Sequence, residues 1–369
     1  MPSPVIDVHT HCLTEQWFSL LQQHGGPRYS VRAVAGGMRA IHLDGAPFMT
    51  PVPAMFDYDL RIRTMNDVGV DVGIVSLTCP NCYWGGPEVS LQAARLMNDD
   101  MAAARTAHPD RLRWFASLPW QYPSSRCRSS NARSAAGASG VMVLANVDGR
   151  PLTDPAFAPI WSAIDARSLP VLVHPTAPPG VGAMDMVRFQ LTASIGFTFD
   201  TSLAIARMIY DGFFDRYRKL RIIAAHGGGA LPYLVSRMDQ CFDNIPACRE
   251  KISRAPSEYV PQILRRRGRL RPDVLDLCLK VFGADNVLVR LRLSAHHRRH
   301  AGMPEARQRP RRRGERQGAR AQCAASVRAV AQHRYRSAPT SRGVARACGL
   351  HTPGARRPRH SPLVRRRGL

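Results

Sequence analysis

Two histidines near the start of the chain have the spacing of a metal-binding pair. His9 and His11 follow the apolar run Val5–Val8, which has the residue types of a buried strand. Residues i and i+2 of an extended strand point to the same side, so both imidazoles can reach one ion. Neutral imidazole suits zinc and its neighbours, and a third histidine with a carboxylate would complete a site that leaves a position open. The alternative is a strand end that carries two histidines and no metal.

Two further histidines end apolar runs later in the chain. His174 closes Val171–His174, and His226 closes Ile222–His226. The three glycines that follow, Gly227–Gly229, permit a close approach of the backbone and could also hold an anion. One histidine at a strand end is commonly a core or loop residue with an ordinary partner. Four histidines at the same place in one repeating pattern indicate a shared site.

Apolar strands alternate with helical segments over most of the chain. The predicted strands are Val5–Val8, Val72–Leu77, Leu112–Ser117, Gly140–Leu144, Val171–His174 and Leu220–Ala225. The predicted helices are Val89–Ala107, Asp154–Arg167, Phe199–Ile209 and Ala230–Phe242. This order predicts a parallel α/β fold, and its length favours a closed (β/α)8 barrel of the TIM type over an open sheet. Active sites of such barrels lie at the carboxyl ends of the strands, where all four histidines fall.

The charge of the chain is concentrated at one end. The formal net charge is +25, but residues 289–369 contain 22 Arg, no Lys and 2 acidic residues, a net of +20. Residues 1–288 carry 30 basic and 25 acidic residues and are nearly neutral. One interpretation of this arginine-rich tail is contact with nucleic acid. Against it, Tyr335 is the tail's lone aromatic residue on which a base could stack.

Cellular location is predicted from what the sequence lacks. It has no apolar run near 18 residues, and no signal peptide precedes the first strand. The nine cysteines stand at irregular spacings, as reduced thiols do, and the close pair Cys79 and Cys82 has no second pair to complete a metal site. We therefore expect a cytoplasmic protein that does not contact the membrane.

Four motifs of the chain are the HTH opening, LVHP around His174, AHGGGALPYLVSRMD from Ala225 to Asp239, and APSEYV from Ala255 to Val260. Together they resemble the amidohydrolase-related family that contains aminocarboxymuconate-semialdehyde decarboxylase and the metal-dependent aromatic-acid decarboxylases. The resemblance covers roughly residues 4–288. It implies a (β/α)8 barrel with one divalent metal, zinc or manganese, a small carboxylate substrate and a homodimer.

Individual positions also match the family. His9, His11 and His174 match its metal ligands, and His226 its catalytic histidine. Arg237 matches an arginine that binds substrate in a neighbouring subunit's site. The implied reaction is decarboxylation of an unsaturated or aromatic acid, and metal-dependent hydrolysis is the alternative that the wider superfamily offers.

One departure from the family pattern concerns the substrate. The family decarboxylase has an arginine immediately before the Pro-Val pair that is Pro51-Val52 here, whereas this chain has Thr50. Without that cation a dicarboxylate substrate would lose a bidentate partner. Aminocarboxymuconate semialdehyde itself is therefore not the expected substrate.

The family's fourth ligand, an aspartate in the motif FGSDYP, is absent after Leu288. Back-translated and read one base later, the following residues can encode that motif, with the aspartate codon spanning Arg292 and Leu293. Offset readings also turn Ser124–Ser139 into an amphipathic helix and Gln262–Leu270 into an apolar strand. We infer slips of the reading frame. We therefore expect a barrel over residues 1–288 with a damaged seventh strand and no eighth, a disordered tail over 289–369, and impaired activity.

Overall fold

Eight parallel strands form one curled sheet in the computed structural model, which describes residues 4–123, 135–266, 271–283 and 286–288. Each strand pairs with the next along the chain, in the order β1-β5-β6-β7-β10-β11-β12-β13. Their bounds are β1 (Ile6–His11), β5 (Val72–Ser76), β6 (Leu112–Ser117), β7 (Gly140–Leu144), β10 (Pro170–His174), β11 (Arg221–Ala224), β12 (Ile263–Arg266) and β13 (Val287–Leu288). The predicted α/β barrel architecture is confirmed, and the six predicted strands are all present.

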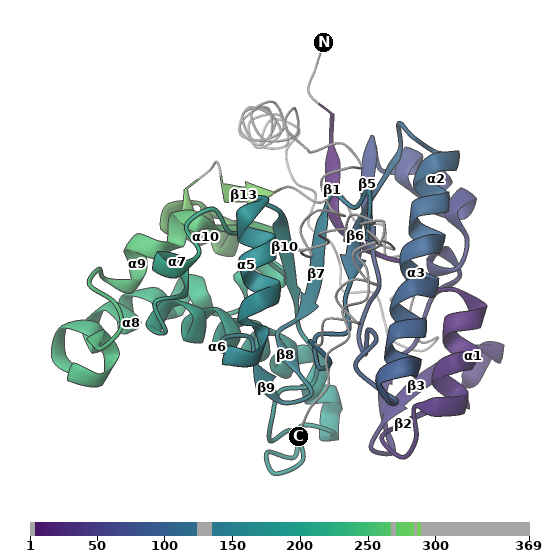
Figure 1. The fold of residues 1–369 in the computed structure, drawn as a ribbon, viewed down its shortest axis with the longest axis horizontal. Coiled ribbons are helices and arrows are strands. Elements are labelled where there is room, and N and C mark those ends of the chain that lie inside the picture. The colour runs from purple at the N-terminus through teal and green to yellow at the C-terminus, as the bar shows by residue number, and fades with distance from the viewer. Residues whose placement is uncertain (1–3, 124–134, 267–270, 284–285, 289–369) are drawn as a thin grey trace, which may run out of the picture.

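Helices lie outside this sheet, with α1–α3 on one side and α5–α10 on the other (Figure 1). Their bounds are α1 (Glu15–His24), α2 (Tyr58–Asp67), α3 (Pro87–Ala107), α5 (Ala158–Ala166), α6 (Phe197–Tyr210), α7 (Phe213–Arg216), α8 (Leu231–Asn244), α9 (Pro256–Tyr259) and α10 (Pro272–Phe282). The four predicted helices correspond to α3, α5, α6 and α8. In the described part of the chain, no helix has the length and apolar character needed to cross a membrane.

The central strands β7 and β10 are almost entirely apolar because both of their faces are covered. All five residues of β7 are buried, as are Val171, Leu172 and Val173 of β10. Parallel strands between a barrel core and a layer of helices have this uniform pattern. The helices, in contrast, bury one face, as α3 does with Leu91, Ala94 and Met97.

The last two strands bear on the predicted damage. β12 pairs with β11 through Ile222↔Ile263, Ile223↔Leu264 and Ala224↔Arg265, and Ile263 and Leu264 are buried. β13 consists of two residues at the end of the described chain. β12 has four residues, as β11 does, and the eighth strand, which we expected to be absent, is present as the two residues of β13. Of the altered stretches, residues 124–134, 267–270 and 289–369 lie outside the described residues.

Two small antiparallel additions were not predicted. One is the sheet of β2 (Tyr29–Ala33), β3 (Arg39–Leu43) and β4 (Ala46–Met49); the other is the hairpin of β8 (Asn146–Val147) and β9 (Arg150–Pro151). Both contain a two-residue Asp-Gly turn, Asp44-Gly45 and Asp148-Gly149, with positive φ at all four residues. This is the type I′ turn that joins tight hairpins, so the Asp-Gly pairs were the available sequence signal.

Candidate metal centre

The four histidines singled out in the sequence converge at one end of the barrel. The Nε2 atoms of His9 and His11 are 2.8 Å apart, and those of His11 and His174 are 3.2 Å apart. One ligand atom from each of these three residues lies within 4.8 Å of the others, so the set could hold a metal ion. The ring of His226 lies 5.3 Å from that of His9 and 5.5 Å from that of His174, measured between centroids.

The strands explain this convergence. His9 and His11 lie within β1, which extends three residues beyond its predicted end and shifts register against β5 between Asp7 and Thr10. His174 is the last residue of β10, and His226 follows β11 after one residue. Since these strands are parallel, their carboxyl ends share one rim. Convergence therefore follows from topology, as the sequence predicted.

The second ring nitrogens of two of these histidines are already engaged. His174 Nδ1 lies 2.7 Å from the Pro175 carbonyl, and His11 Nδ1 lies 3.2 Å from Ser76 Oγ. A carbonyl only accepts, so His174 carries its proton on Nδ1 and leaves the Nε2 lone pair for a ligand bond. Two nitrogens bound at ~2.0–2.1 Å to one ion would be about 2.9–3.4 Å apart. The observed spacing fits a three-imidazole metal site.

His226 has an unusual backbone. Its φ is 50°, in the left-handed region that non-glycine residues rarely occupy, and such conformations gather at functional sites. The imidazole stacks on Phe197, with ring centroids 6.3 Å apart at an angle of 23°. The conformation holds the ring at the rim, beside the three-histidine cluster.

The glycines after His226 serve close packing. A Cβ at Gly229 would lie 2.3 Å from the Thr198 carbonyl oxygen, and its φ is 63°. The amides of Gly228, Gly229 and Ala230 donate to Ala225, His226 and the Ser202 hydroxyl. Because these three N–H groups already donate within the protein, they do not support the prediction that this glycine segment holds an anion.

Arg61 is a buried cation behind the cluster that the sequence did not reveal. It is 4% exposed and lies on α2. Its guanidinium donates to Thr10 Oγ1, to the carbonyl of His11, and to the Ala54 carbonyl at 2.6 Å. All three acceptors are neutral. Arg61 thus ties the end of β1 to the turn that precedes α2.

A second buried charge stands behind the loops at the rim. Asp200 on α6 is 2% exposed; its Oδ2 accepts from the Thr176 amide at 2.9 Å and its Oδ1 from the Asn146 side chain at 3.0 Å. Burial raises the pKa of Asp200 to about 6 even though both N–H donors favour the charged form. This carboxylate joins the segments that follow β7 and β10.

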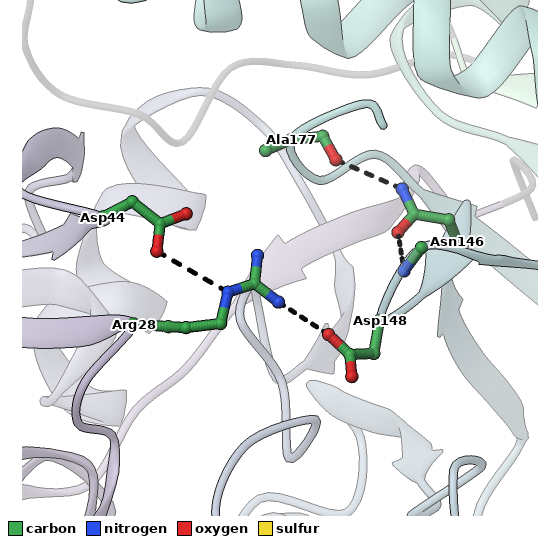
Figure 2. A network of polar contacts seen from close by, with 6 residues as sticks. Arg28, Asp44, Asn146, Asp148 and Ala177 are labelled. Carbon is green, nitrogen blue, oxygen red and sulfur yellow. Dashed lines mark hydrogen bonds and ion pairs between the residues drawn. The ribbon is translucent and has the colours of Figure 1, made fainter. Parts of the chain in front are cut away.

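A cavity of about 280 Å³ opens near the carboxyl ends of β7 and β10. Its lining comes from the start of β2, the end of β3 and the turn after it, the loop after β5, the end of β7, the β8–β9 hairpin and the residues after His174. Arg28 lies there between two aspartates, with Nη1 2.6 Å from Asp148 and Nε 3.7 Å from Asp44 (Figure 2). Asn146 fixes the hairpin by accepting from the Gly149 amide and donating to the Ala177 carbonyl.

Two other positions singled out in the sequence are exposed. Arg237 lies on α8. Thr50, where the family pattern has arginine, is exposed just after β4. The predicted aspartate ligand falls beyond Leu288 and outside the described residues.

Sequence reasoning missed Arg61, Asp200 and Arg28. On a helix, an arginine or aspartate is by default a solvated residue, so the pattern gave no reason to single out the first two. Arg28 precedes β2, an element that was itself not predicted.

Comparison with known proteins identifies the class. A model of the amidohydrolase family matches residues 6–288, and the chain belongs to this family. It is 31% identical over 260 residues to 2-amino-3-carboxymuconate-6-semialdehyde decarboxylase of Dictyostelium discoideum. The aligned region covers 69% of this chain and 72% of that protein. The resemblance drawn from the motifs is confirmed.

Solved structures share the fold. The 5-carboxyvanillate decarboxylase from Sphingomonas paucimobilis gives a TM-score of 0.67 at 22% identity and covers 94% of this chain and 96% of that one. A dihydroxybenzoic acid decarboxylase from Polaromonas sp. JS666, with bound manganese and 2-nitroresorcinol, gives 0.62 at 22% identity and covers 78% and 85%.

Proposed function

We propose that this chain is a metal-dependent carboxy-lyase that removes CO2 from an aromatic or unsaturated carboxylic acid. The observation that carries the proposal is the three-histidine cluster with His226 beside it, in an amidohydrolase-family chain whose sequence relative is a decarboxylase. His9, His11 and His174 would hold one divalent ion. Zinc is the first choice for three imidazoles, and manganese is the alternative because the Polaromonas enzyme binds it.

The chain's own residues supply the rest of the reaction. A bound cation would polarise the substrate and fix its orientation. When the carbon–carbon bond breaks, CO2 leaves, the electron pair stays on the former substrate carbon, and that carbon takes up a proton. His226 lies beside the cluster and is the residue we assign to moving this proton. Phe197, stacked on His226, would keep its ring in place.

The assembly and location follow from the same proposal. Arg237 is exposed on α8, so it is accessible to a second subunit, and we propose a homodimer in which it reaches the partner's substrate site. Six cysteines of the described chain are free thiols, which suits the reducing cytoplasm.

The test measures metal content and reaction products separately. The 369-residue chain, loaded with zinc or manganese, is offered hydroxybenzoates and unsaturated acids for CO2 release, and esters, lactones and amides for hydrolysis. We expect slow CO2 release from this chain, because its activity is expected to be impaired, and faster release once the reading frame is restored. His226→Asn should keep the metal and lose about 10²- to 10⁴-fold in rate. His24→Asn, an exposed histidine at the end of α1, is the matched control and should change neither. Hydrolysis without CO2 release would favour the hydrolase alternative and overturn the proposal.

A further inference from the structure

The cavity that contains Arg28 opens at the same end of the barrel as the histidine cluster. Its lining includes Leu144, the last residue of β7, and Thr176, two residues after His174. At about 280 Å³ it has the size of a site for a small molecule. The four histidines do not line it. It is therefore a neighbouring compartment, suited to a part of the ligand that does not react.

Aromatic side chains connect this cavity with His226. Tyr29 lines the cavity and contacts Phe48, with ring centroids 6.4 Å apart. Phe48 contacts Phe197 at 6.3 Å, and Phe197 stacks on His226. A flat, unsaturated ligand fits along such a wall, because ring faces and edges are its natural partners.

The charges in the cavity do not suit a second carboxylate. Among its described lining residues only Arg28, Asp44 and Asp148 carry formal charge, a sum of −1. Arg28 lies within ion-pair distance of both aspartates, so its positive charge is already compensated (Figure 2).

The remaining polar groups are neutral. Tyr83 is 7% exposed and lines the cavity, and burial raises the pKa of its hydroxyl well above the usual range, so it stays protonated. Both amide atoms of Asn146 are engaged: Nδ2 donates to Asp200 and to the Ala177 carbonyl, and Oδ1 accepts from the Gly149 amide within the hairpin. The lining therefore offers the carboxylates of Asp44 and Asp148 as acceptors, beside neutral hydroxyls such as that of Tyr83.

We propose that this Arg28 cavity is the distal subsite of the substrate, and that it selects acids whose far end carries a hydroxyl or amino group over acids that carry a second carboxylate there. A hydroxyl or amine can donate to Asp148 or Asp44, whereas a carboxylate is repelled by both. The inference rests on the proposed function, because it takes the first carboxylate to lie at the histidine cluster.

The experiment compares matched ligands on the manganese-loaded 369-residue chain. Calorimetry gives the Kd of 3-hydroxybenzoate, 3-aminobenzoate and benzene-1,3-dicarboxylate. We expect the hydroxyl and amino acids to bind about two- to fivefold more tightly, the effect of one partly exposed charge pair. Asp148→Asn should shift the preference toward the dicarboxylate. Arg28→Gln should shift it further against the dicarboxylate, so the two variants move in opposite directions.

Asp67→Asn is the control, since Asp67 is exposed at the end of α2 and does not line the cavity. Equal Kd values for the ligands, no binding of any of them, or a preference unchanged in both cavity variants would each overturn the subsite. CO2 release is measured in the same samples. Binding preference without CO2 release would count against the proposed function alone, and CO2 release without the preference would count against the subsite alone.

Discussion

The buried carboxylate of Asp200 should make the stability of this protein depend on pH in a way that Asp200→Asn removes. The residue is 2% exposed, and its two oxygens accept N–H bonds from Thr176 and Asn146. Burial nonetheless raises its pKa from 3.8 to about 6. The folded protein therefore binds this proton more tightly than the unfolded chain does.

The direction and size of the effect follow from that difference. A raised pKa contributes stability that is fully present below pH 3.8 and is lost as the pH rises through about 6. The full difference corresponds to about 3 kcal/mol at 1.36 kcal/mol per pKa unit. Between pH 7.5 and pH 4.5, linkage gives about 2 kcal/mol of this. The free energy of unfolding of the unmodified chain, relative to the variant, should rise by that amount on acidification.

Denaturant unfolding of both chains between pH 4.5 and 7.5 measures this. Asparagine cannot accept both N–H bonds, so the variant also loses about 1–3 kcal/mol at every pH. The test is therefore how the difference in the free energy of unfolding between the two chains changes with pH. The constant part of that difference does not test the reasoning. Asp67→Asn, an exposed residue at the end of α2, controls for removing a carboxylate in general. A difference between the unmodified chain and Asp200→Asn that stays constant over this range would refute the reasoning.

Three further outcomes are expected. His174→Ala should weaken divalent-metal binding by more than about tenfold, since a direct ligand matters at least as much as its outer partners, and competition with a chromogenic chelator measures this. Arg61→Met should lower the free energy of unfolding by about 2–4 kcal/mol, because three buried acceptors lose their donor; Arg61→Lys should recover less than half, since an ammonium cannot replace the planar fork. Restoring the reading frame at the three altered stretches should raise metal content and CO2 release above those of this chain, and equal values would contradict the inferred slips.

The barrel strands could be predicted because of their burial. A parallel strand covered on both faces is a continuous apolar run, and β6 and β7 have the predicted bounds. The convergence of the histidines followed from their place at strand ends. The end of a strand was harder to predict where the strand carries polar residues. The predicted strand ended at Val8, whereas β1 continues through polar residues to His11.

The additions at the rim and the buried charges could not be predicted in the same way. β3 includes Arg39 and His42, so it has no apolar run, and its Asp-Gly turn is a local signal that does not say what the hairpin packs against. Arg61 and Asp200 are charged residues on helices, and their burial depends entirely on contacts with distant segments. Such contacts are a property of the tertiary fold.

The histidine cluster and the inferred loss of the fourth ligand can be separated experimentally. Partners of the cluster include Ser76 on β5, the Pro175 carbonyl and Arg61 on α2. Each precedes the arginine-rich tail by more than one strand of the sheet. Folding of residues up to β11 would therefore suffice for a three-imidazole site, whereas a carboxylate ligand would have to come from beyond Leu288. Metal that binds weakly to this chain through His174, and more tightly once the frame is restored, would indicate that the tail removes the fourth ligand and leaves the cluster intact.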